Sequence, residues 1–326
     1  MIPKQPPRDG QPGFLYLPPI RVHGISVAGE QTTITVPEFD LTFDIGQSTR
    51  SALATPLIAL SHTHMDHIGG MPYWFSQRNF QKLEGGRVLC HPDAVDPIRK
   101  MLASWVDVER QRTPFDIQPI EPESDVEIRK GVFLRAIETR HTCPSLGFVV
   151  IEKRKKLREE FRELPQSELR RLRAEGEDLT FAIEIPLVAY TGDTERGEFL
   201  ERDEFRKARV VLSECTFFDP DHRERARIGR HLHLDDIRTL LGSWEADHVV
   251  LVHMSRRTLI SDARSRVESL GEEADRVHIL MDHRTNRRRY ENQQADALLK
   301  SDPVINSESG ETTLDSQSSK PADGTS

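Results

Sequence analysis

The chain has 326 residues, of which 36% are hydrophobic and 30% are charged. This composition is typical of a folded protein and excludes a chain that is disordered throughout. The formal net charge of -8 provides no overall positive surface for nucleic acid, so an anionic substrate would have to be bound locally, by metal or by a basic patch. No apolar run approaches the roughly 18 residues that a membrane span needs, and the N-terminus lacks the apolar core of a secretory signal. We therefore expect a cytoplasmic protein without a membrane segment.

The two ends of the sequence differ in composition from its centre. Residues 1–19 contain six prolines, which predicts a flexible N-terminal arm. Residues 291–326 are polar and acidic, which predicts a disordered tail. The intervening residues 20–290 are expected to form one domain.

Within this domain, strand-like and helix-like segments alternate. Strands are predicted around 39–43, at 56–60 ("PLIAL") and at 87–92 ("RVLCHP"), and 126–139 predicts a hairpin that turns at Lys130 and Gly131. This mixture of strands and helices predicts a layered α/β sandwich. Further strands are predicted at 146–152, 186–193, 208–214 and 247–253, and helices at about 93–109, 155–175, 234–243 and 261–270.

A charged insertion interrupts this pattern at about 152–180. Its core, residues 152–176, interleaves cationic and anionic side chains and predicts two short amphipathic helices broken at Pro165. In isolation such a run is most simply a solvated helical hairpin. It also contains the densest basic cluster of the chain, which is suited to phosphate contacts and consists of Lys153, Arg154, Lys155, Lys156 and Arg158.

The stretch "SHTHMDHIGG" at 61–70 places three histidines and an aspartate directly after an apolar strand. His62 and His64 share one side of an extended segment, so their imidazoles can converge on one metal ion. Asp66 and His67 lie at a turn into a helix, offset enough to serve a second ion. The three cysteines are widely spaced and form no Cys-x-x-Cys pair, so a thiolate site is not indicated.

Further ligand-type residues follow other apolar strands. His141, Asp193 and His253 each come after such a strand, in the same position as the first cluster. Each residue alone would be an ordinary loop or core residue. Together, five histidines and two aspartates predict two metal sites suited to zinc, with manganese or iron as possible occupants.

The order H-x-H-x-D-H, a lone His, a lone Asp in "TGDT" and a final His resembles the metallo-β-lactamase superfamily. This resemblance implies a four-layer αββα sandwich with the metals at one edge of its two sheets. The implied ligands are His62, His64 and His141 for one ion and Asp66, His67 and His253 for the other, with Asp193 bridging the two.

Within that superfamily, several segments resemble ribonuclease Z. "HTCPSLGFVV" at 141–150 is similar to its H-x-x-P-S-x-G segment, and "SECTFFD" at 213–219 to its H-E-A-T-F segment, with Ser where the family often has His. "GRHLHLDDI" at 229–237 and "HMSRR" at 253–257 also resemble segments of that family, and residues 20–285 as a whole look most like its plant short form. "DIGQSTR" departs from the bacterial pattern, which leaves the choice of cleavage site open.

The resemblance implies an endoribonuclease that removes the 3′ trailer of precursor tRNA, with two Zn²⁺ ions. It also implies a homodimer in which the insertion of one subunit grips the RNA for the site of the other. Asp66 would orient the nucleophilic water, and His231 would protonate the leaving 3′ oxygen, with Glu214 fixing its tautomer and raising its pKa. His233, close by in the chain, is expected to have a supporting position.

Two alternatives remain open from the sequence. Another hydrolase of the same fold, acting on small or cyclic nucleotide diesters, would share all seven ligands. A non-catalytic RNA-binding relative is the second alternative, although such a protein would have less need of an intact ligand set. A β-lactamase or a thioesterase is disfavoured because neither explains Glu214 and His231.

Overall fold

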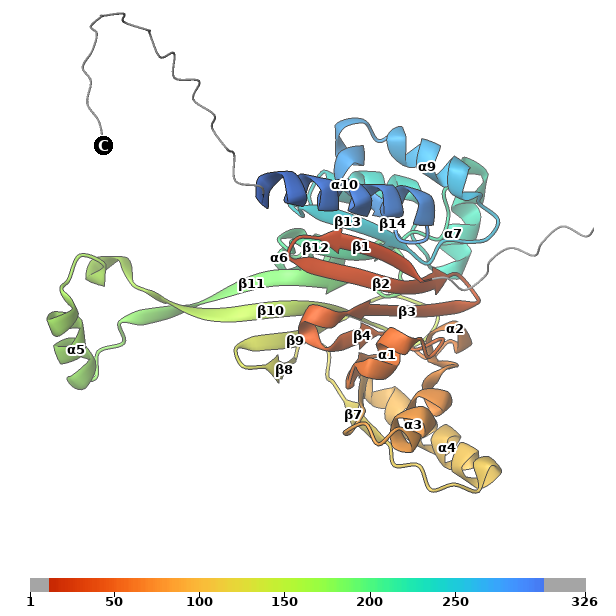
Figure 1. Cartoon of the computed structure of the whole chain (residues 1–326), viewed down its shortest axis with the longest axis horizontal. Helices are drawn as coiled ribbons and strands as arrows, with labels where there is room; N and C mark the ends of the chain where they lie inside the picture. The colour runs from red at the N-terminus through yellow and green to blue at the C-terminus, as the bar shows by residue number, and fades with distance from the viewer. Residues whose placement is uncertain (1–11, 302–326) are drawn as a thin grey trace, which may run out of the picture.

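The computed structural model describes residues 12–301 and contains two sheets packed face to face, with helices on both outer sides (Figure 1). The predicted four-layer αββα sandwich is therefore confirmed. The first sheet has the order β1 (Gly13–Leu17), β2 (Ile20–Val27), β3 (Gln31–Val36), β4 (Leu41–Phe43), β5 (Leu57–Ala59), β6 (Arg87–Cys90) and β7 (Asp116–Pro119). The second has the order β14 (Val277–Ile279), β13 (His248–Val252), β12 (Val210–Glu214), β11 (Thr180–Tyr190), β10 (Leu146–Leu157), β9 (Val132–Glu138) and β8 (Asp125–Arg129).

The helices divide between the two outer layers and the connecting segments. Predicted helices at 93–109, 234–243 and 261–270 are confirmed as α4, α8 and α9. The helix expected after Asp66 and His67 is present as α2 and α3, whereas no helix was predicted at 283–301, where α10 lies. The helices are α1 (Arg50–Ala54), α2 (Met65–Ile68), α3 (Met71–Phe80), α4 (Pro92–Glu109), α5 (Gln166–Ala174), α6 (Asp203–Arg206), α7 (Arg223–Gly229), α8 (Leu234–Leu241), α9 (Ile260–Glu268) and α10 (His283–Ser301), with short 3-10 turns between them.

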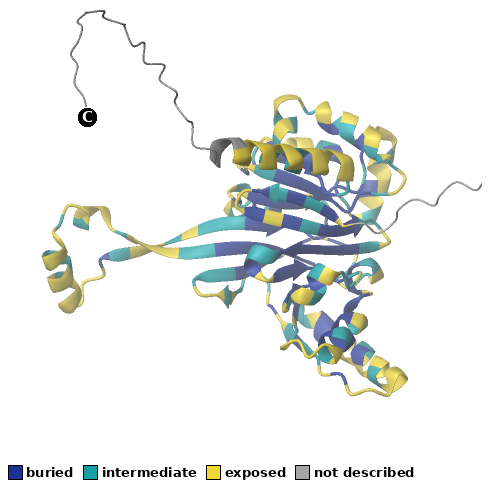
Figure 2. Cartoon of the chain, viewed as in Figure 1, coloured by how far each residue is buried: buried dark blue, intermediate teal, exposed yellow. Residues whose placement is uncertain are grey.

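The core lies in three layers, one between the sheets and one beneath each set of helices (Figure 2). Strand β12 is apolar without alternation because both of its faces are covered: Val210 and Leu212 face the other sheet, whereas Val211 faces the helices. Between the sheets, the ring of Phe43 lies 4.9 Å from that of Tyr190. The two sheets are thus joined directly behind the strand ends.

The parallel strands bring their C-terminal ends to one edge of the sandwich. In the first sheet β4, β5, β6 and β7 run parallel, and in the second β11, β12, β13 and β14 do. Because β9 and β11 are both antiparallel to β10, β9 ends at the same edge. The N–H of Leu146 donates to the carbonyl of Ser61 (2.8 Å), which joins the loops of the two sheets there. Loops that follow strands of both sheets therefore meet at one place.

The prediction of a flexible arm over 1–19 is wrong for Gly13–Leu17, which form β1. This strand pairs antiparallel with β2, and its Leu15 and Leu17 are buried between the sheets. Pairing with a neighbouring strand and burial of alternate leucines outweigh the proline-rich composition. Residues 1–11 lie outside the described part of the chain.

The prediction of a disordered tail over 291–326 is wrong for its first part, because α10 continues to Ser301. The helix lies along β1, where the ring of Tyr290 meets Phe14 edge-on at 5.1 Å and the side-chain amide of Gln293 donates to the carbonyl of Tyr16 (3.1 Å). These contacts with a segment far away in the sequence could not be anticipated from local composition. Residues 302–326 lie outside the described part of the chain.

The charged insertion is a projecting β-hairpin with a helical tip, which corrects the helical prediction for 155–157 and confirms the predicted break at Pro165. Strand β10 continues to Leu157 and pairs with β11 as far as Thr180, so both strands project well beyond the sandwich (Figure 1). Only the tip contains helix, as a 3-10 turn at Glu159–Phe161 and as α5, and neither buries a residue (Figure 2). We call residues 152–185 the arm. The helical prediction failed for 155–157 because hydrogen bonding to the partner strand decided the backbone there. It is confirmed for α5, which begins directly after Pro165.

Within residues 12–301, no helix is both long and apolar enough to cross a lipid bilayer.

Candidate active site

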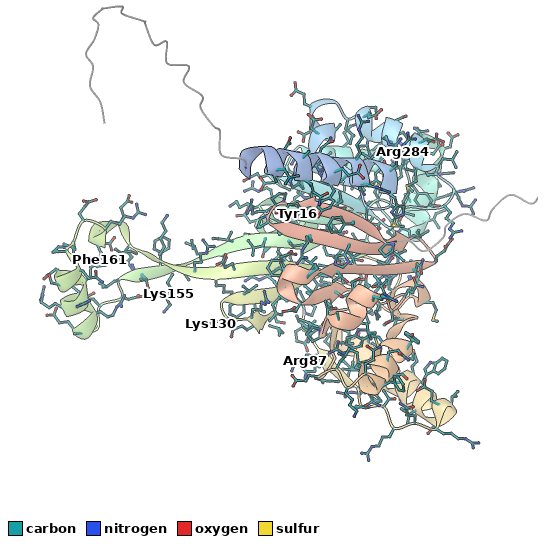
Figure 3. All side chains as sticks on the ribbon, viewed as in Figure 1. Tyr16, Arg87, Lys130, Lys155, Phe161 and Arg284 are labelled. Atoms are coloured by element: carbon teal, nitrogen blue, oxygen red, sulfur yellow. The ribbon has the colours of Figure 1, made fainter. Side chains whose placement is uncertain are left out.

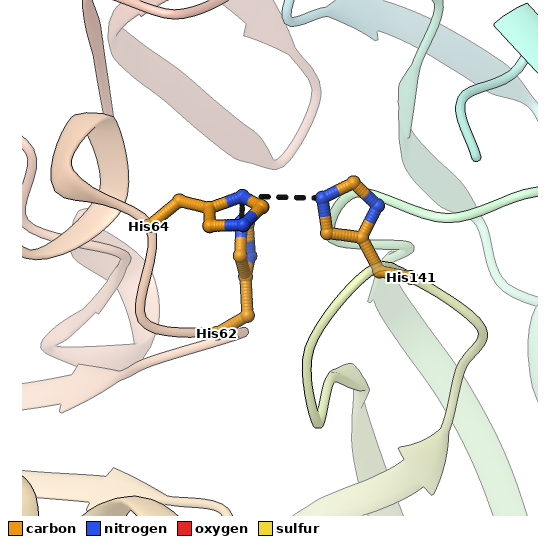
Figure 4. Close-up of side chains that lie close together, drawn as sticks. All are labelled: His62, His64 and His141. Atoms are coloured by element: carbon orange, nitrogen blue, oxygen red, sulfur yellow. Dashed lines mark hydrogen bonds between the residues drawn. The ribbon is translucent and has the colours of Figure 1, made fainter. Parts of the chain in front are cut away.

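Seven predicted ligands from four segments meet at the edge where the strands end. Figure 4 shows the first three, His62, His64 and His141, with their rings converging. The Nδ1 atom of His64 lies 3.0 Å from Nε2 of His62 and 3.2 Å from Nε2 of His141. His64 therefore presents Nδ1 to the centre of the group, whereas the other two present Nε2.

The remaining ligands form a second group beside the first. Nε2 of His253 lies 3.3 Å from Oδ2 of Asp66, and Nε2 of His67 lies 3.6 Å from the same oxygen. Asp193 lies between the groups, because its Oδ2 is 3.1 Å from Nε2 of His253, 3.3 Å from Nε2 of His67 and 3.8 Å from Nε2 of His62. This position is the one expected of a ligand shared by two cations.

Two buried polar atoms at the centre of the site have no hydrogen-bond partner. They are Nε2 of His67 and Oδ1 of Asp193, and both residues are almost completely buried. A buried polar atom without a partner is costly in a folded protein. A cation bound among these nitrogen and oxygen atoms would satisfy both, so the donor set fits the metal that the sequence predicts.

A buried carboxylate, Asp44, fixes the tautomers of two ligands. It accepts hydrogen bonds from Nδ1 of His67 (2.8 Å), from the hydroxyl of Tyr190 (2.6 Å), and from both the N–H (2.7 Å) and the hydroxyl (2.9 Å) of Ser61. Because the hydroxyl hydrogen of Ser61 is directed to Asp44, its oxygen accepts a hydrogen bond from Nδ1 of His62 (3.0 Å). Both histidines therefore keep Nε2 free for a cation.

A second buried carboxylate, Glu214, acts in the same way on the other side of the site. The hydroxyl of Thr216 donates to Oε2 of Glu214 (2.8 Å), so its oxygen accepts from Nδ1 of His253 (3.0 Å). Oε1 of Glu214 accepts from the N–H of Thr194 (2.8 Å), which fixes the backbone directly after Asp193. One carboxylate thus positions two of the ligands.

The same Glu214 also holds His231, which is not among the seven ligands. Nδ1 of His231 lies 3.1 Å from Oε1 of Glu214 and 4.0 Å from Asp193. Burial alone would lower the pKa of His231, but the charge and the hydrogen bond of Glu214 outweigh it and raise the pKa to about 9. A protonated imidazole beside the ligand cluster is a candidate proton donor.

Sequence comparison identifies the superfamily to which this site belongs. A family model described as "Beta-lactamase superfamily domain" matches residues 39–254. The chain belongs to the β-lactamase superfamily. A chloroplastic tRNase Z of Arabidopsis thaliana is 29% identical over 252 residues, covering 76% of this chain and 71% of that protein. A second tRNase Z of the same plant is 27% identical over 252 residues, covering 76% of this chain and 90% of its own length.

Solved structures agree on the fold. The short form of human tRNase Z superposes with a TM-score of 0.51 at 16% identity, covering 71% of this chain and 91% of that one. The resemblance to the metallo-β-lactamase superfamily and to ribonuclease Z is therefore confirmed. With this fold, this ligand set and these relatives, the protein is a metal-dependent hydrolase of the superfamily.

The charge state of four of the proposed ligands suits cation binding. At His67 burial is outweighed by Asp193 and Asp44, which raise its pKa, so a cation there would displace a proton. Burial lowers the pKa of His62, His64 and His141, which favours the neutral imidazoles that metals require. Burial alone would raise the pKa of Asp66, but its hydrogen bond to His253 and the charges of His67 and His253 lower it to about 2. Asp66 is therefore a carboxylate, and it also accepts the N–H of Gly29 (2.8 Å).

The structure places His233 away from the cation site. Its Nδ1 accepts the N–H of Asp235 (3.1 Å) and its Nε2 donates to the carbonyl of Asp219 (2.9 Å), so the ring caps α8 and ties that helix to a neighbouring loop. Its position supports α8 rather than the reacting groups.

Sequence reasoning missed Asp44, Ser61 and Thr216 as positioning residues. A signal for Asp44 was present, because it directly follows a buried strand just as the ligands do. Asp44 and His253 both have φ of 58°, a left-handed conformation that is uncommon outside glycine and found at functional sites. Ser61 and Thr216 gave no signal, because a lone hydroxyl beside an apolar strand has no distinctive pattern.

Substitution of Thr216 by valine is expected to weaken metal binding about 10–100-fold, because His253 would lose the acceptor that fixes its tautomer. Titration of the metal-free protein with zinc, followed by calorimetry, measures this. Serine at the same position keeps the hydroxyl and should restore most of the affinity. Equal affinity of the Val and Ser variants would contradict the role assigned to the hydroxyl.

Proposed function

We propose that this protein is a zinc-dependent endoribonuclease that removes the 3′ trailer from precursor tRNA by hydrolysing one phosphodiester and leaving a 3′-hydroxyl. The observation that carries the proposal is the Glu214–His231 pair beside the seven-ligand cluster. Ester hydrolysis at a metal site needs a proton donor only when the leaving group is a poor one, as a ribose oxygen is. Similarity to curated tRNase Z proteins across 76% of the chain supports the same reaction.

The proposed cofactor is a pair of Zn²⁺ ions, with Mn²⁺ or Fe²⁺ as possible occupants. His62, His64 and His141 would hold one ion, Asp66, His67 and His253 the other, and Asp193 would contribute to both. Such a pair lowers the pKa of a water molecule and withdraws charge from the phosphoryl group. A donor set of imidazoles and carboxylates suits all three metals.

The protein's own groups supply the remaining steps. Asp66 is ionised and half-buried, so it can orient the attacking water and accept its proton. His231 can protonate the leaving 3′ oxygen through Nε2, because its Nδ1 is held by Glu214. Glu214 stabilises the imidazolium before transfer and keeps the ring oriented afterwards.

The arm is proposed to bind the RNA away from the scissile bond, with a smaller basic set than the sequence indicated. Lys153 is engaged by Asp125 (2.6 Å) and Glu184 (3.1 Å), and Arg154 by Glu152 (2.6 Å). Lys155 and Lys156 are exposed on the outer part of the arm, and Lys155 extends away from the ribbon (Figure 3). These two lysines are the better candidates for phosphate contacts.

A homodimer is the proposed assembly, since the arm points away from its own active site. The twelve residues of β10 begin beside Ser61 and rise about 3.3 Å each, so the far end of the strand lies about 36 Å from the site. Figure 1 shows α5 and α2 at opposite sides of the molecule. Exposed apolar side chains on α2, α3 and α4 offer a surface for a second copy: Met65, Tyr73, Phe80, Trp105 and Val108.

The decisive experiment is incubation of the zinc-loaded protein with a precursor tRNA that carries a 3′ trailer, with and without a chelator. We expect one chelator-sensitive cut at the junction of trailer and tRNA, leaving a 3′-hydroxyl. No such cut, together with rapid hydrolysis of cyclic nucleotides, would favour the alternative small-diester phosphodiesterase. A chain that binds fewer than two metal ions and cuts neither substrate would favour a non-catalytic RNA-binding protein.

We propose the cytoplasm as the location of this protein.

Removal of the outer arm is expected to impair cleavage of precursor tRNA much more than hydrolysis of bis(p-nitrophenyl) phosphate. Replacement of 155–182 by a two-residue Asn-Gly turn removes Lys155 and Lys156 and keeps β10 and β11 paired up to Arg154 and Ile183. The impaired cleavage of precursor tRNA should appear as a higher KM, because the arm would act in binding the RNA. As a control, Lys155→Ala with Lys156→Ala keeps the hairpin and should reproduce part of the effect. Equal losses on both substrates would contradict a role in RNA binding.

A further inference from the structure

A cavity of about 340 Å³ opens beside His231. It is bounded by α7, by the start of α8 and by the loop that follows Asp193, and its lining includes Glu195, Arg196, Arg223 and Arg227. Its volume lies at the lower end of the 300–1,000 Å³ range of small-ligand pockets. There is room for one nucleotide, but not for a longer stretch of RNA.

The position of His231 determines which part of a substrate would enter this cavity. Glu214 holds Nδ1, so Nε2 is the nitrogen that can reach a substrate. Gly229 packs so closely against the ring that an added Cβ would lie 3.0 Å from Cδ2 and 3.7 Å from Nε2 of His231. A proton from Nε2 goes to the leaving oxygen, so the group bound beside His231 must be the one that carries this oxygen.

The cavity also contains cationic groups that can exchange partners. Arg227 is paired with Glu224 (2.6 Å) on the same helix, and Arg196 with Glu201 (3.1 Å). Arg223 is paired with Asp235. Exposed pairs of this kind contribute about 0–1 kcal/mol, so a phosphate, which offers a charge-assisted bidentate contact, can displace the carboxylate.

We propose that this cavity binds the nucleotide whose 3′ oxygen is the leaving group, which is the last nucleotide of the mature RNA, and that Arg223 and Arg227 contact the phosphate on its 5′ side. This inference rests on the proposed function and specifies the substrate side that the cavity serves. Glu195 can accept a hydrogen bond from a ribose hydroxyl or a base amino group of that nucleotide. The 3′ trailer would extend from the metal ligands in the direction away from α7.

The test is a double-mutant cycle in which one change is made in the protein and the other in the RNA substrate, with KM as the measured quantity. Glu195→Ala is combined with a precursor tRNA that is abasic at the last mature nucleotide, and separately with one that is abasic at the first trailer nucleotide. Each change alone should raise KM about tenfold, as loss of a hydrogen bond to a charged group does. With the abasic last nucleotide the two losses should be less than additive. Additive losses there, or coupling to the trailer nucleotide instead, would overturn the proposal.

A binding measurement separates failure of the subsite from failure of the proposed function. The probe is a three-nucleotide RNA with a 3′-hydroxyl, titrated into the metal-loaded protein, and Arg227→Ala with Arg223→Ala should weaken its binding at least tenfold. If the wild type does not cleave precursor tRNA but binds the probe in this arginine-dependent way, the subsite stands and the proposed function fails. If the wild type cleaves precursor tRNA but the double variant binds the probe as tightly as the wild type, the subsite is wrong and the proposed function stands.

The matched control is Arg209→Ala. Arg209 is also an exposed arginine in an ion pair, with Asp247 at 3.1 Å, but it lies at the opposite ends of β12 and β13 from the active site. Its loss should alter neither the coupling nor the binding of the probe. A loss of binding in this control equal to that in the double variant would mean that overall charge, and not the cavity, governs affinity.

Discussion

Replacement of Asp193 by alanine is expected to abolish hydrolysis of any phosphodiester and to remove most of the bound metal. Its Oδ2 atom lies within 4 Å of ligands from both groups, so no other carboxylate can compensate for it. The loss should exceed the roughly 10–100-fold cost of disturbing an outer partner of a ligand, such as Thr216. Metal content after gel filtration and the rate with bis(p-nitrophenyl) phosphate measure both effects.

The control for this experiment must separate loss of a ligand from loss of the fold. Asp193→Asn keeps the size of the side chain and one acceptor oxygen but removes the negative charge, so it should retain more metal than Asp193→Ala. Asp203→Ala removes an exposed carboxylate that pairs with Lys207 (2.6 Å) and should behave like the wild type. If Asp193→Ala keeps full metal content and normal turnover, Asp193 does not bridge the two groups of ligands.

The convergence of the seven candidate ligands was predictable because it follows a rule of topology. Each ligand segment comes directly after a buried strand, and parallel strands end at one edge, so the polar residues after them must meet. His141 and His253 are far apart in the sequence, yet both obey this rule. The compact H-x-H-x-D-H cluster then indicates the chemistry.

Interactions that depend on a distant partner were not predictable from the sequence. The arm is the clearest case, since its charge pattern predicts helix from residue 155, but the backbone of 152–157 pairs with residues 23 to 33 positions away, as Leu157 with Thr180 and Glu152 with Ile185 do. Gly13–Leu17 and the first part of the acidic tail became ordered for the same reason, through contacts between β1 and α10. Local composition predicts the preferences of an isolated segment, but it does not predict contacts with segments that are distant in the sequence.

The outer partners of the ligands were also largely hidden. Glu214 was identified through its expected pairing with His231, but its link through Thr216 to His253 depends on a single hydroxyl. This arrangement means that one buried carboxylate contacts both the candidate cation site and His231, the proposed proton donor. A change at Glu214 therefore affects two functions at once, and its variants alone cannot show which function His231 performs.

Replacement of His231 itself separates these functions. His231→Ala should lower kcat for precursor tRNA by about 10²–10⁴-fold, the usual contribution of a general acid, with a smaller change in KM. Metal content should remain close to that of the wild type, because Nδ1 of His231 is engaged by Glu214 and the seven ligands are intact. Single-turnover cleavage and metal analysis of the same preparation measure both quantities.

The leaving group provides the test that a merely structural role would not pass. A nitrophenolate ion leaves readily without a proton, whereas a ribose 3′ oxygen does not, so His231→Ala should lose far less activity on bis(p-nitrophenyl) phosphate than on RNA. His248→Ala is the matched control, because His248 lies at the other end of the strand that presents His253. Equal losses on both substrates, or a parallel loss of metal, would make His231 a ligand or a structural residue. A loss confined to RNA would place the proton donor at the rim of the cavity beside α7, on the side of the substrate that leaves with a 3′-hydroxyl.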